Sequence, residues 1–194
     1  NHKAHAGSCD LGDATAIKRY IEEAAQALGG IDVLVNNASG FGSTDDEAGW
    51  AVGLNVDVMA TVRASHAALP WLEKAGAANE VNGGKAGASI INISSISGLR
   101  PAGRQPPYGA VKAAIIHYTL SQAATLARKN IRANCIAPGS IEFPGGVWDR
   151  RKKDAPQLYN AVHKSIPFGR LGHPEEIASV ALFLASPLAN WVTG

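Results

Sequence analysis

Tyr108 and Lys112 stand four residues apart at the start of an alanine-rich run. In a helix, these two positions lie on one face, so a phenol would lie beside an ammonium group. A neighbouring ammonium favours the ionised phenol and lowers its pKa from the usual value of about 10. The spacing therefore predicts that Tyr108 can act as an acid or a base near neutral pH.

A strand and a loop precede this pair. Residues 89–93 form an apolar, β-rich run that leads into Ser94 and Ser95, and Ser95 lies thirteen residues before Tyr108. Ser95 would lie at the carboxyl end of the strand, where open α/β sheets bind ligands. Ser94 would point the opposite way, so it is assigned no catalytic role. By itself the Tyr108–Lys112 spacing also suits an ordinary surface pair, and the preceding serine favours a catalytic site.

Three other motifs occur along the chain in a fixed order. They are NNASG at residues 36–40, LNV at residues 54–56 and NCIAPG at residues 134–139. Together with Ser95, Tyr108 and Lys112, they resemble the short-chain dehydrogenase/reductase family, from residue 9 to residue 194. Residues 134–139 and 168–170 are similar to the oxoacyl-carrier-protein reductase-like branch of that family. The resemblance implies an enzyme that uses NAD or NADP to interconvert a carbonyl and an alcohol.

The resemblance also implies a role for each catalytic residue. Tyr108 would be the general acid for carbonyl reduction and the base for alcohol oxidation. Lys112 would lower the pKa of Tyr108 and hydrogen-bond the nicotinamide ribose, and Ser95 would hold the substrate oxygen. Asn55, in the LNV motif, would bind a water that links Lys112 to solvent, and the alternative is that its amide kinks or caps a helix.

Further positions match the family's cofactor and substrate contacts. The cofactor contacts implied are Asp10, Leu11, Asn37, Ala38, Ser39, Ile93, Tyr108, Lys112, Pro138, Gly139 and Ile141. Ser39 stands where the family motif usually has glycine, and Phe143 stands where it usually has threonine. The expected substrate contacts are Ser95, from the resemblance, and Leu99, Phe143, Val147 and Trp148, from the lid described next.

The resemblance implies that Pro138, Gly139 and Ile141 belong to a loop that contacts the nicotinamide. Residues 143–164 follow this loop and contain glycines near their start, so they should form a lid over the substrate that is poorly ordered without ligand. Its apolar residues should face inward, and the charged run at residues 149–154 should face solvent. An apolar lid favours an apolar or acyl-type ketone over a free sugar, whose hydroxyl groups would lack partners.

Composition excludes several other classes. The chain of 194 residues, 46% hydrophobic and 18% charged, indicates one globular domain, residues 1–194. A net charge of +2 gives no reason to expect a nucleic-acid partner, and no apolar run is long enough for a membrane span. The six histidines show no metal-ligand spacing, so no metal is expected. Cys9 and Cys135 suit reduced thiols in a cytoplasmic protein, and a disulfide is the alternative.

The element pattern predicts an α/β fold with a doubly wound, Rossmann-like parallel sheet in three layers. A strand is expected to end at residues 8–11, and further strands are expected at residues 31–35, 89–93 and 131–136. The strand at residues 31–35 should be buried on both faces. Helices are expected from Asp13 to Gly29 and over residues 44–53, 55–74, 107–129 and 175–185, with the 55–74 helix interrupted or ended near Pro70. Residues 75–87 are expected to be a loop and residues 138–164 to be irregular.

The sequence contains no glycine-rich GxGxxG or GxxxGxG turn of the kind that cradles a pyrophosphate at a helix N-terminus. We therefore expect that this chain is a fragment or an incomplete sequence, and that it lacks the first βαβ unit and the last strand. The helices at 55–74 and 107–129 match the pair that family members pack against a neighbour, so a homodimer or homotetramer is expected. The competing function is a catalytically silent, cofactor-binding regulatory or scaffold protein.

Overall fold

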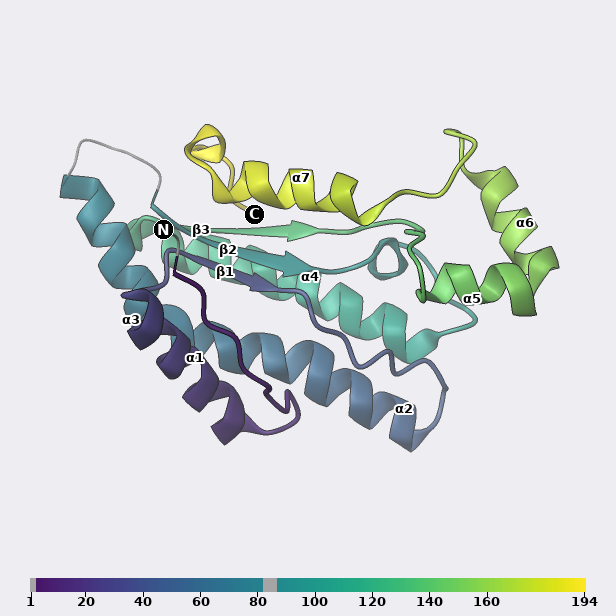
Figure 1. Ribbon diagram of the computed structural model, residues 1–194, viewed down its shortest axis with the longest axis horizontal. Helices are drawn as coiled ribbons and strands as arrows, with labels where there is room; N and C mark the ends of the chain where they lie inside the picture. The colour runs from purple at the N-terminus through teal and green to yellow at the C-terminus, as the bar shows by residue number, and fades with distance from the viewer. Residues whose placement is uncertain (1–2, 82–86) are drawn as a thin grey trace.

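A computed structural model describes residues 3–81 and 87–194 (Figure 1). Its sheet consists of β1 (Val33–Asn36), β2 (Ala88–Ile93) and β3 (Ile131–Ile136), all parallel and in the order β1-β2-β3. In register, Leu34 lies opposite Ile90, and Ile90 lies opposite Ala133. Because parallel neighbours end at the same edge, the loops that leave all three strands meet on one side of the molecule.

Helices cover both faces of this sheet. The helices α3 (Ala60–Val81) and α4 (Pro106–Leu126) connect successive strands and pack on one face, with α1 (Ala14–Leu28) lying against α3. The helix α7 (Pro174–Ala185) packs on the other face, against β2 and β3. This three-layer arrangement confirms the predicted α/β class with a doubly wound parallel sheet.

The first helix begins and ends where the sequence predicts. The Asp13 carboxylate accepts a hydrogen bond of 2.8 Å from the Thr15 N–H, which satisfies one of the free donors of the first turn. Gly29 closes the helix with φ of 94°, a left-handed conformation that glycine adopts without strain. Ile17 and Ile21 therefore face the core from a helix of defined length.

The next helix is longer than predicted. The segments α2 (Glu47–Val52), a π-helical turn at Gly53–Met59 and α3 follow one another without a break, and Pro70 lies inside α3. The predicted end near Pro70 and the predicted loop at residues 75–81 are therefore wrong, while residues 82–86 lie outside the described residues. Packing explains the difference: a Cβ at Gly76 would lie 2.3 Å from the Lys129 carbonyl oxygen, so the absence of a side chain lets α3 continue past this contact.

Two strand predictions are also corrected. Residues 8–11 form no strand, although Cys9 and Leu11 pack against the core. The first strand of the sheet is not buried on both faces, because Leu34 is buried but Val33 and Val35 are 38% and 47% exposed. The helix α7 covers β2 and β3 on its side of the sheet, which leaves Val33 and Val35 of β1 partly exposed.

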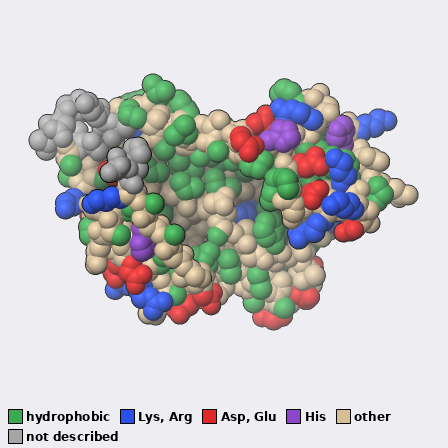
Figure 2. All heavy atoms as spheres, in the orientation of Figure 1, with side chains coloured by type: hydrophobic (Ala, Val, Ile, Leu, Met, Phe, Trp, Pro, Cys, Tyr) green, Lys and Arg blue, Asp and Glu red, His purple; other side chains and the backbone are tan. Residues whose placement is uncertain are grey.

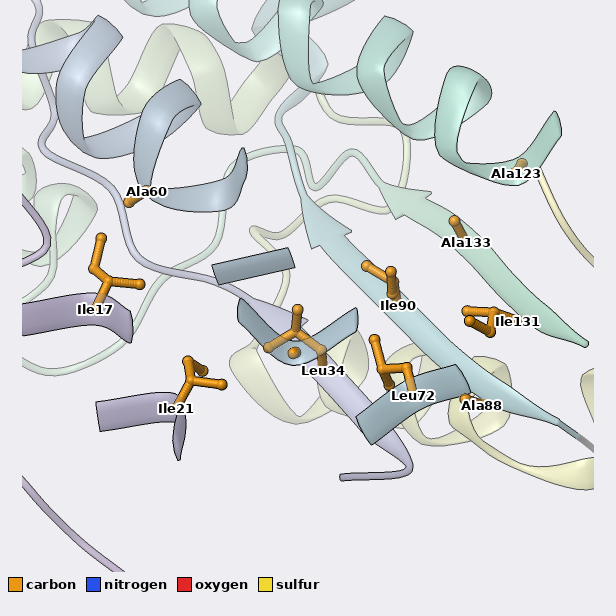
Figure 3. Close-up of a cluster of buried hydrophobic side chains, with 11 residues drawn as sticks. Ile17, Ile21, Leu34, Ala60, Leu72, Ala88, Ile90, Ala123, Ile131 and Ala133 are labelled. Atoms are coloured by element: carbon orange, nitrogen blue, oxygen red, sulfur yellow. The ribbon is translucent and has the colours of Figure 1, made fainter. Parts of the chain in front are cut away.

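A single apolar cluster joins α1, α3 and the sheet (Figure 3). Ile17 and Ile21 of α1 approach Leu34, and Leu72 of α3 lies near Ile90 of β2. Burying a side chain of this size contributes roughly 1.5–3 kcal/mol relative to leaving it exposed. This cluster holds the helices on the sheet and so fixes the strand ends from which the site is built.

Two further helices lie beyond the carboxyl end of the strands, where irregular structure was predicted. They are α5 (Val147–Asp154) and α6 (Pro156–Ser165) (Figure 1). The base of this region is tied to the segment before α7 by a bridge between Ile141 and Gly172. Short 3₁₀ turns at Ile96–Gly98, Ala127–Lys129 and Pro187–Ala189 complete the described structure. Within residues 3–81 and 87–194, no helix combines the length and apolar character needed to cross a bilayer.

Candidate active site

Ser95 follows directly from the central strand. Its backbone is extended, with φ of −160° and ψ of 154°, and its Oγ accepts a hydrogen bond of 3.2 Å from the Ser97 N–H. The 3₁₀ turn that follows lies against α4 so closely that a Cβ at Gly98 would be 2.7 Å from the Ala113 nitrogen. Ser95 is thus fixed relative to α4, the helix that carries the other two catalytic candidates.

Tyr108 and Lys112 lie in the first two turns of α4, and Pro106 occupies a permitted position at its start. The Lys112 Nζ lies 5.6 Å from the centroid of the Tyr108 ring and donates a hydrogen bond of 3.1 Å to the Ile93 carbonyl. The Ser95 side chain lies near enough to the Tyr108 hydroxyl to lower the pKa of that phenol. The structure therefore brings a hydroxyl, a phenol and an ammonium together at the carboxyl end of β2.

Two buried side chains, Ser94 and Asn92, hold α4 on the sheet beneath this group. The Ser94 hydroxyl donates a 2.7 Å hydrogen bond to the Lys112 carbonyl, which is a structural rather than a catalytic role. Deeper in the sheet, the Asn92 amide donates to Thr119 and Gln122 of α4, both at 2.9 Å. A buried amide with these partners fixes the helix against β2 both along and across the strand.

The environment of Tyr108 corrects one prediction. Burial raises the pKa of Tyr108 above its ordinary value of 10.0, the hydrogen bond from Ser95 lowers it, and the negative charge of Asp57 raises it again. The net shift is upward, opposite to the predicted lowering by Lys112. The main physical reason is burial, which disfavours the charged phenolate. In addition, the Lys112 ammonium is paired with the Asp57 carboxylate at 3.0 Å, which offsets its charge.

Asp57 is the charged residue of the site that the sequence did not predict. It lies in the π-helical turn with its side chain fully buried. Besides Lys112, its carboxylate accepts hydrogen bonds from the Ser39 hydroxyl at 2.6 Å and from the Gly40 N–H at 3.0 Å. Ser39 could have indicated this residue from the sequence, because it replaces the usual glycine of the motif and its hydroxyl needs a hydrogen-bond partner, which is Asp57.

The Asn55 side chain is held by two protein partners. Its Nδ2 donates to the Gly12 carbonyl at 3.2 Å and its Oδ1 accepts from Arg63 at 2.9 Å. Its backbone carbonyl accepts from the Ala60 N–H within the π-helical turn. The Asn55 amide thus joins the loop before α1 to the long helix, and Asp57 is the residue that contacts Lys112 directly. The water-binding role of Asn55 stays a prediction.

A cavity of about 730 Å³ opens above these residues. On the face in Figure 2, hydrophobic side chains gather around a central hollow that has a basic side chain at its floor. The site residues predicted from the sequence that line the cavity are Asn37, Ala38, Ser39, Ile93, Ser95, Tyr108, Lys112, Pro138, Gly139, Ile141, Phe143, Val147 and Trp148. Segments far apart in the chain thus surround one space.

Three further predicted contacts are not among the residues that line this cavity. The Asp10 carboxylate accepts a 2.8 Å hydrogen bond from the Gly12 N–H, and Leu11 packs against the core. Leu99, predicted as a wall of the substrate site, is 65% exposed and lies outside the lining. Leu99 follows the 3₁₀ turn at Ile96–Gly98, and its contact with a substrate stays a prediction.

Phe41 and one face of α7 also line the cavity, although the sequence analysis assigned them no role. The α7 residues are Ile177, Ala178 and Ala181, with Pro174 at the start of the helix. Phe41 follows the NNASG motif directly, and this adjacency was the signal in the sequence. Since α7 is distant in sequence from the motifs, only packing brings it to the site.

The lid segment supplies an apolar wall. Phe143, Val147 and Trp148 line the cavity from the start of this segment, and the charged run of α5 is largely exposed, as predicted. Trp148 contacts the Tyr159 ring edge-on with centroids 6.5 Å apart. The Tyr159 hydroxyl donates at 3.0 Å to Glu142, at the base of the segment. These contacts join α5, α6 and the base into one packed unit.

Comparisons with known proteins agree with this geometry. A family model described as enoyl-(acyl carrier protein) reductase matches residues 1–194. Isoepoxydon dehydrogenase of Penicillium expansum is 37% identical over 187 residues, covering 95% of this chain and 68% of that protein. The 3-oxoacyl-[acyl-carrier-protein] reductase of Thermotoga maritima is 37% identical over 189 residues, covering 94% and 70%. Human dehydrogenase/reductase SDR family member 4 is 34% identical over 193 residues, covering 96% and 64%.

Solved structures share the fold. A short-chain dehydrogenase/reductase from Burkholderia xenovorans has a TM-score of 0.84 and 30% identity, with 96% of this chain and 70% of that chain covered. A 7α-hydroxysteroid dehydrogenase complexed with NADH and 7-oxo glycochenodeoxycholic acid has a TM-score of 0.81 and 32% identity, with 95% and 68% covered. The chain thus spans roughly two thirds of the length of these relatives. With a family model matched over all 194 residues, the chain belongs to the short-chain dehydrogenases/reductases.

Proposed function

We propose that the full-length protein is an NAD(P)-dependent oxidoreductase that interconverts a carbonyl and an alcohol by hydride transfer. The observation that carries this proposal is the convergence of Ser95, Tyr108 and Lys112 at the floor of one apolar-walled cavity. Membership of the family supports it, since the relatives described above are named as dehydrogenases and reductases. The cofactor is NAD or NADP, as in the relative whose structure holds NADH.

The residues around the cavity fit the nicotinamide end of such a cofactor. The Lys112 ammonium has three donors, of which Asp57 and the Ile93 carbonyl take two, so the third suits a ribose hydroxyl. At Gly139 an added Cβ would meet no described atom within 4 Å, which leaves room for a ring to approach the backbone. When bound, the nicotinamide supplies or accepts the hydride.

Ser95 and Tyr108 would then act on the substrate oxygen. The Ser95 Oγ already accepts from the Ser97 N–H, so its own proton is directed to Tyr108 or to a carbonyl oxygen. Tyr108 keeps its proton at neutral pH because burial raises its pKa, which suits a general acid in carbonyl reduction. Two donors that meet one oxygen stabilise the negative charge that develops there.

The substrate class is an apolar or acyl-type ketone. Aromatic and aliphatic side chains make up the walls, with Phe41 on one side, Phe143 and Trp148 on the lid, and Ile177 on α7. A free sugar would leave hydroxyl groups without partners against these walls, at a cost of roughly 1–3 kcal/mol for each. The relatives named for a steroid and for oxoacyl groups are compatible with such walls.

The assay that tests the function measures consumption of NADPH and of NADH by the full-length protein. The panel includes an aliphatic ketone, an aromatic ketone, a β-ketoacyl thioester and a free sugar, with Tyr108→Phe as the negative control. We expect turnover of an apolar member that Tyr108→Phe abolishes. Binding of either cofactor with no turnover of any ketone would instead support the cofactor-binding scaffold, and a free sugar as the best substrate would overturn the substrate class.

We also propose that the full-length protein is a cytoplasmic homodimer or homotetramer. Both cysteines are free thiols, in keeping with a reducing compartment. The helix α4 exposes small residues at Ala110, Ala114 and Ala124, and Leu120 between them is 49% exposed. Small side chains let a second helix approach closely, which suits a helix-to-helix contact between copies. Light scattering that showed a monomer at every concentration would refute the oligomer.

A further inference from the structure

The buried carboxylate of Asp57 joins three segments that are far apart in sequence. It contacts Ser39 and Gly40 in the loop after β1, and Lys112 on α4, while Asp57 itself belongs to the π-helical turn before α3. The side chain of Asp57 is 0% exposed and that of Lys112 is 4% exposed. A buried charge is stable only when it is paired and hydrogen-bonded, and each of these groups supplies that for the other.

We infer that Asp57 is a positioning residue for the reaction: its carboxylate holds the Lys112 ammonium in place and couples it to the Ser39–Gly40 loop. This inference rests on the proposed function. Asp57 is not in contact with the space above Tyr108, since it is not among the described residues that line the cavity. It acts through Lys112 and through the loop.

Asp57 also reaches the rings of the site through Ser39. The Ser39 hydroxyl donates to Asp57 at 2.6 Å, and its oxygen accepts from the Phe41 N–H at 3.2 Å. Phe41 in turn stacks on Tyr108. One carboxylate therefore fixes both the cation beneath the phenol and the aromatic ring beside it. The serine that replaces the motif's glycine is the residue that makes this connection.

The charge of Asp57 also affects the pH at which the Tyr108 phenol loses its proton. The groups that face Tyr108 are Lys112 on its own helix, Asp57 on the π-helical turn, Ser95 after β2 and Phe41 after β1, and only the first two are charged. The Asp57 charge offsets the Lys112 charge, and it contributes to the raised pKa of Tyr108. Asp57 thus keeps the phenol protonated up to higher pH than Lys112 alone would allow.

The first test compares Asp57→Asn with Ser39→Ala in the full-length protein. Asparagine keeps the shape and removes the charge, which leaves Tyr108 and Lys112 with an uncompensated positive charge, so this pair releases a proton at lower pH. We expect the alkaline limb of the pH profile for carbonyl reduction to move down by about one unit or more. Ser39→Ala removes a hydrogen bond and no charge, so its pH profile should stay in place while the KM for the cofactor rises several-fold.

An unchanged pH profile in Asp57→Asn, or an equal shift in Ser39→Ala, would overturn the inference. The ionisation of Tyr108 can also be followed without turnover, from the ultraviolet difference spectrum between each protein and its Tyr108→Phe counterpart. In that titration the phenol proton should be released at lower pH in Asp57→Asn than in the parent, and release at the same or a higher pH would overturn the inference. This readout separates a failure of the inference from a failure of the proposed function.

A double-mutant cycle on stability tests the ion pair itself. Asp57→Asn and Lys112→Met each leave one buried charged group without its partner, whereas the double variant removes both charges. We expect the unfolding equilibrium constants to show a coupling of about tenfold or more, with the double variant more stable than the two single effects predict. Independent effects would refute the pairing. If Asp57→Asn does not fold, a folded double variant supports the inference and an unfolded one overturns it.

Discussion

The ring of Phe41 lies nearly parallel to the ring of Tyr108, with centroids 6.1 Å apart and planes 10° apart. Phe41 adopts φ of 51°, a left-handed backbone conformation that a bulky residue rarely adopts. A hydrogen bond from its N–H to the Ser39 oxygen, at 3.2 Å, helps to hold it there. Strained residues of this kind persist where the surrounding structure holds them, and here the held ring covers one side of the phenol.

We predict that Phe41→Ala raises the KM for a bulky apolar ketone by about tenfold, and less for a small ketone, because it removes one wall of the cavity. Leu99→Ala is the matched control, since Leu99 is similarly exposed but lies outside the lining. Steady-state kinetics on both substrates measure the effect. A larger rise in Leu99→Ala than in Phe41→Ala would contradict the placement of the two residues.

Tyr108→Phe should lower turnover by about 10²–10⁴-fold, because it deletes the proton donor and leaves the ring in place. Cofactor affinity should remain within a few-fold of the parent protein. Tyr118→Phe serves as the control, since Tyr118 lies on the same helix with its hydroxyl near Gln122 and Ser65, outside the cavity. Rates retained in Tyr108→Phe, or lost equally in Tyr118→Phe, would count against Tyr108 as the acid.

The pH dependence should differ between the two reaction directions. Reduction needs the protonated phenol, and because the pKa of Tyr108 lies above 10.0 this form dominates throughout the neutral range. The reduction rate should therefore be level near neutrality and fall only in strongly alkaline solution. Oxidation needs the phenolate, so its rate should rise by about tenfold per pH unit until the pKa is reached. A reduction rate that falls between pH values of about 6 and 8 would disagree with the buried phenol.

Trp148→Ala should raise the KM for a bulky ketone more than for a small one, with little change in kcat, since Trp148 forms the lid wall rather than the floor. Trp50→Ala is a suitable control because Trp50 is also half-buried but binds Asp45 outside the cavity. Kinetics with two ketones of different size make the comparison. Similar changes in both variants would show that the loss is general destabilisation and not loss of the wall.

Gly98→Ala should both destabilise the protein and reduce turnover. The added Cβ would lie 2.7 Å from backbone atoms of Lys112 and Ala113, so the turn that carries Ser95 must move away from α4. Overpacking of this kind costs typically 1–3 kcal/mol. Gly103→Ala in the same loop has no described atom within 4 Å of its new Cβ and should leave both properties unchanged. Urea denaturation and kcat together measure the two effects.

The elements that depend on local chemistry were predictable from the sequence. Asp13 and Gly29 set the two ends of α1, because a carboxylate satisfies free N–H donors and glycine accepts a positive φ. The apolar runs at β2 and β3 form strands as expected. With the four-residue spacing of Tyr108 and Lys112, a helix is enough to place both side chains on one face, so their proximity could also be predicted from the sequence.

Other features depended on contacts between distant segments. Pro70 and the glycine at position 76 look like helix breakers locally, and α3 continues through them because it packs on α1, the sheet and the end of α4. Phe41 and α7 enter the site only because the sheet brings their segments to one edge. The periodicity of apolar residues along the sequence does not show which distant segments contact one another.

Asn55 and Asp57 show most clearly what only the tertiary structure decided. They are two residues apart, so on a regular helix they face different directions. The family motif drew attention to Asn55, as the residue that binds a water linked to Lys112, and not to Asp57. The π-helical turn and the Arg63 and Gly12 contacts direct the Asn55 amide elsewhere, while the buried Lys112 ammonium requires an opposite charge. The sequence by itself determined the family motifs and the acid Tyr108; the packing of three segments around one buried charge decided which residue supports it.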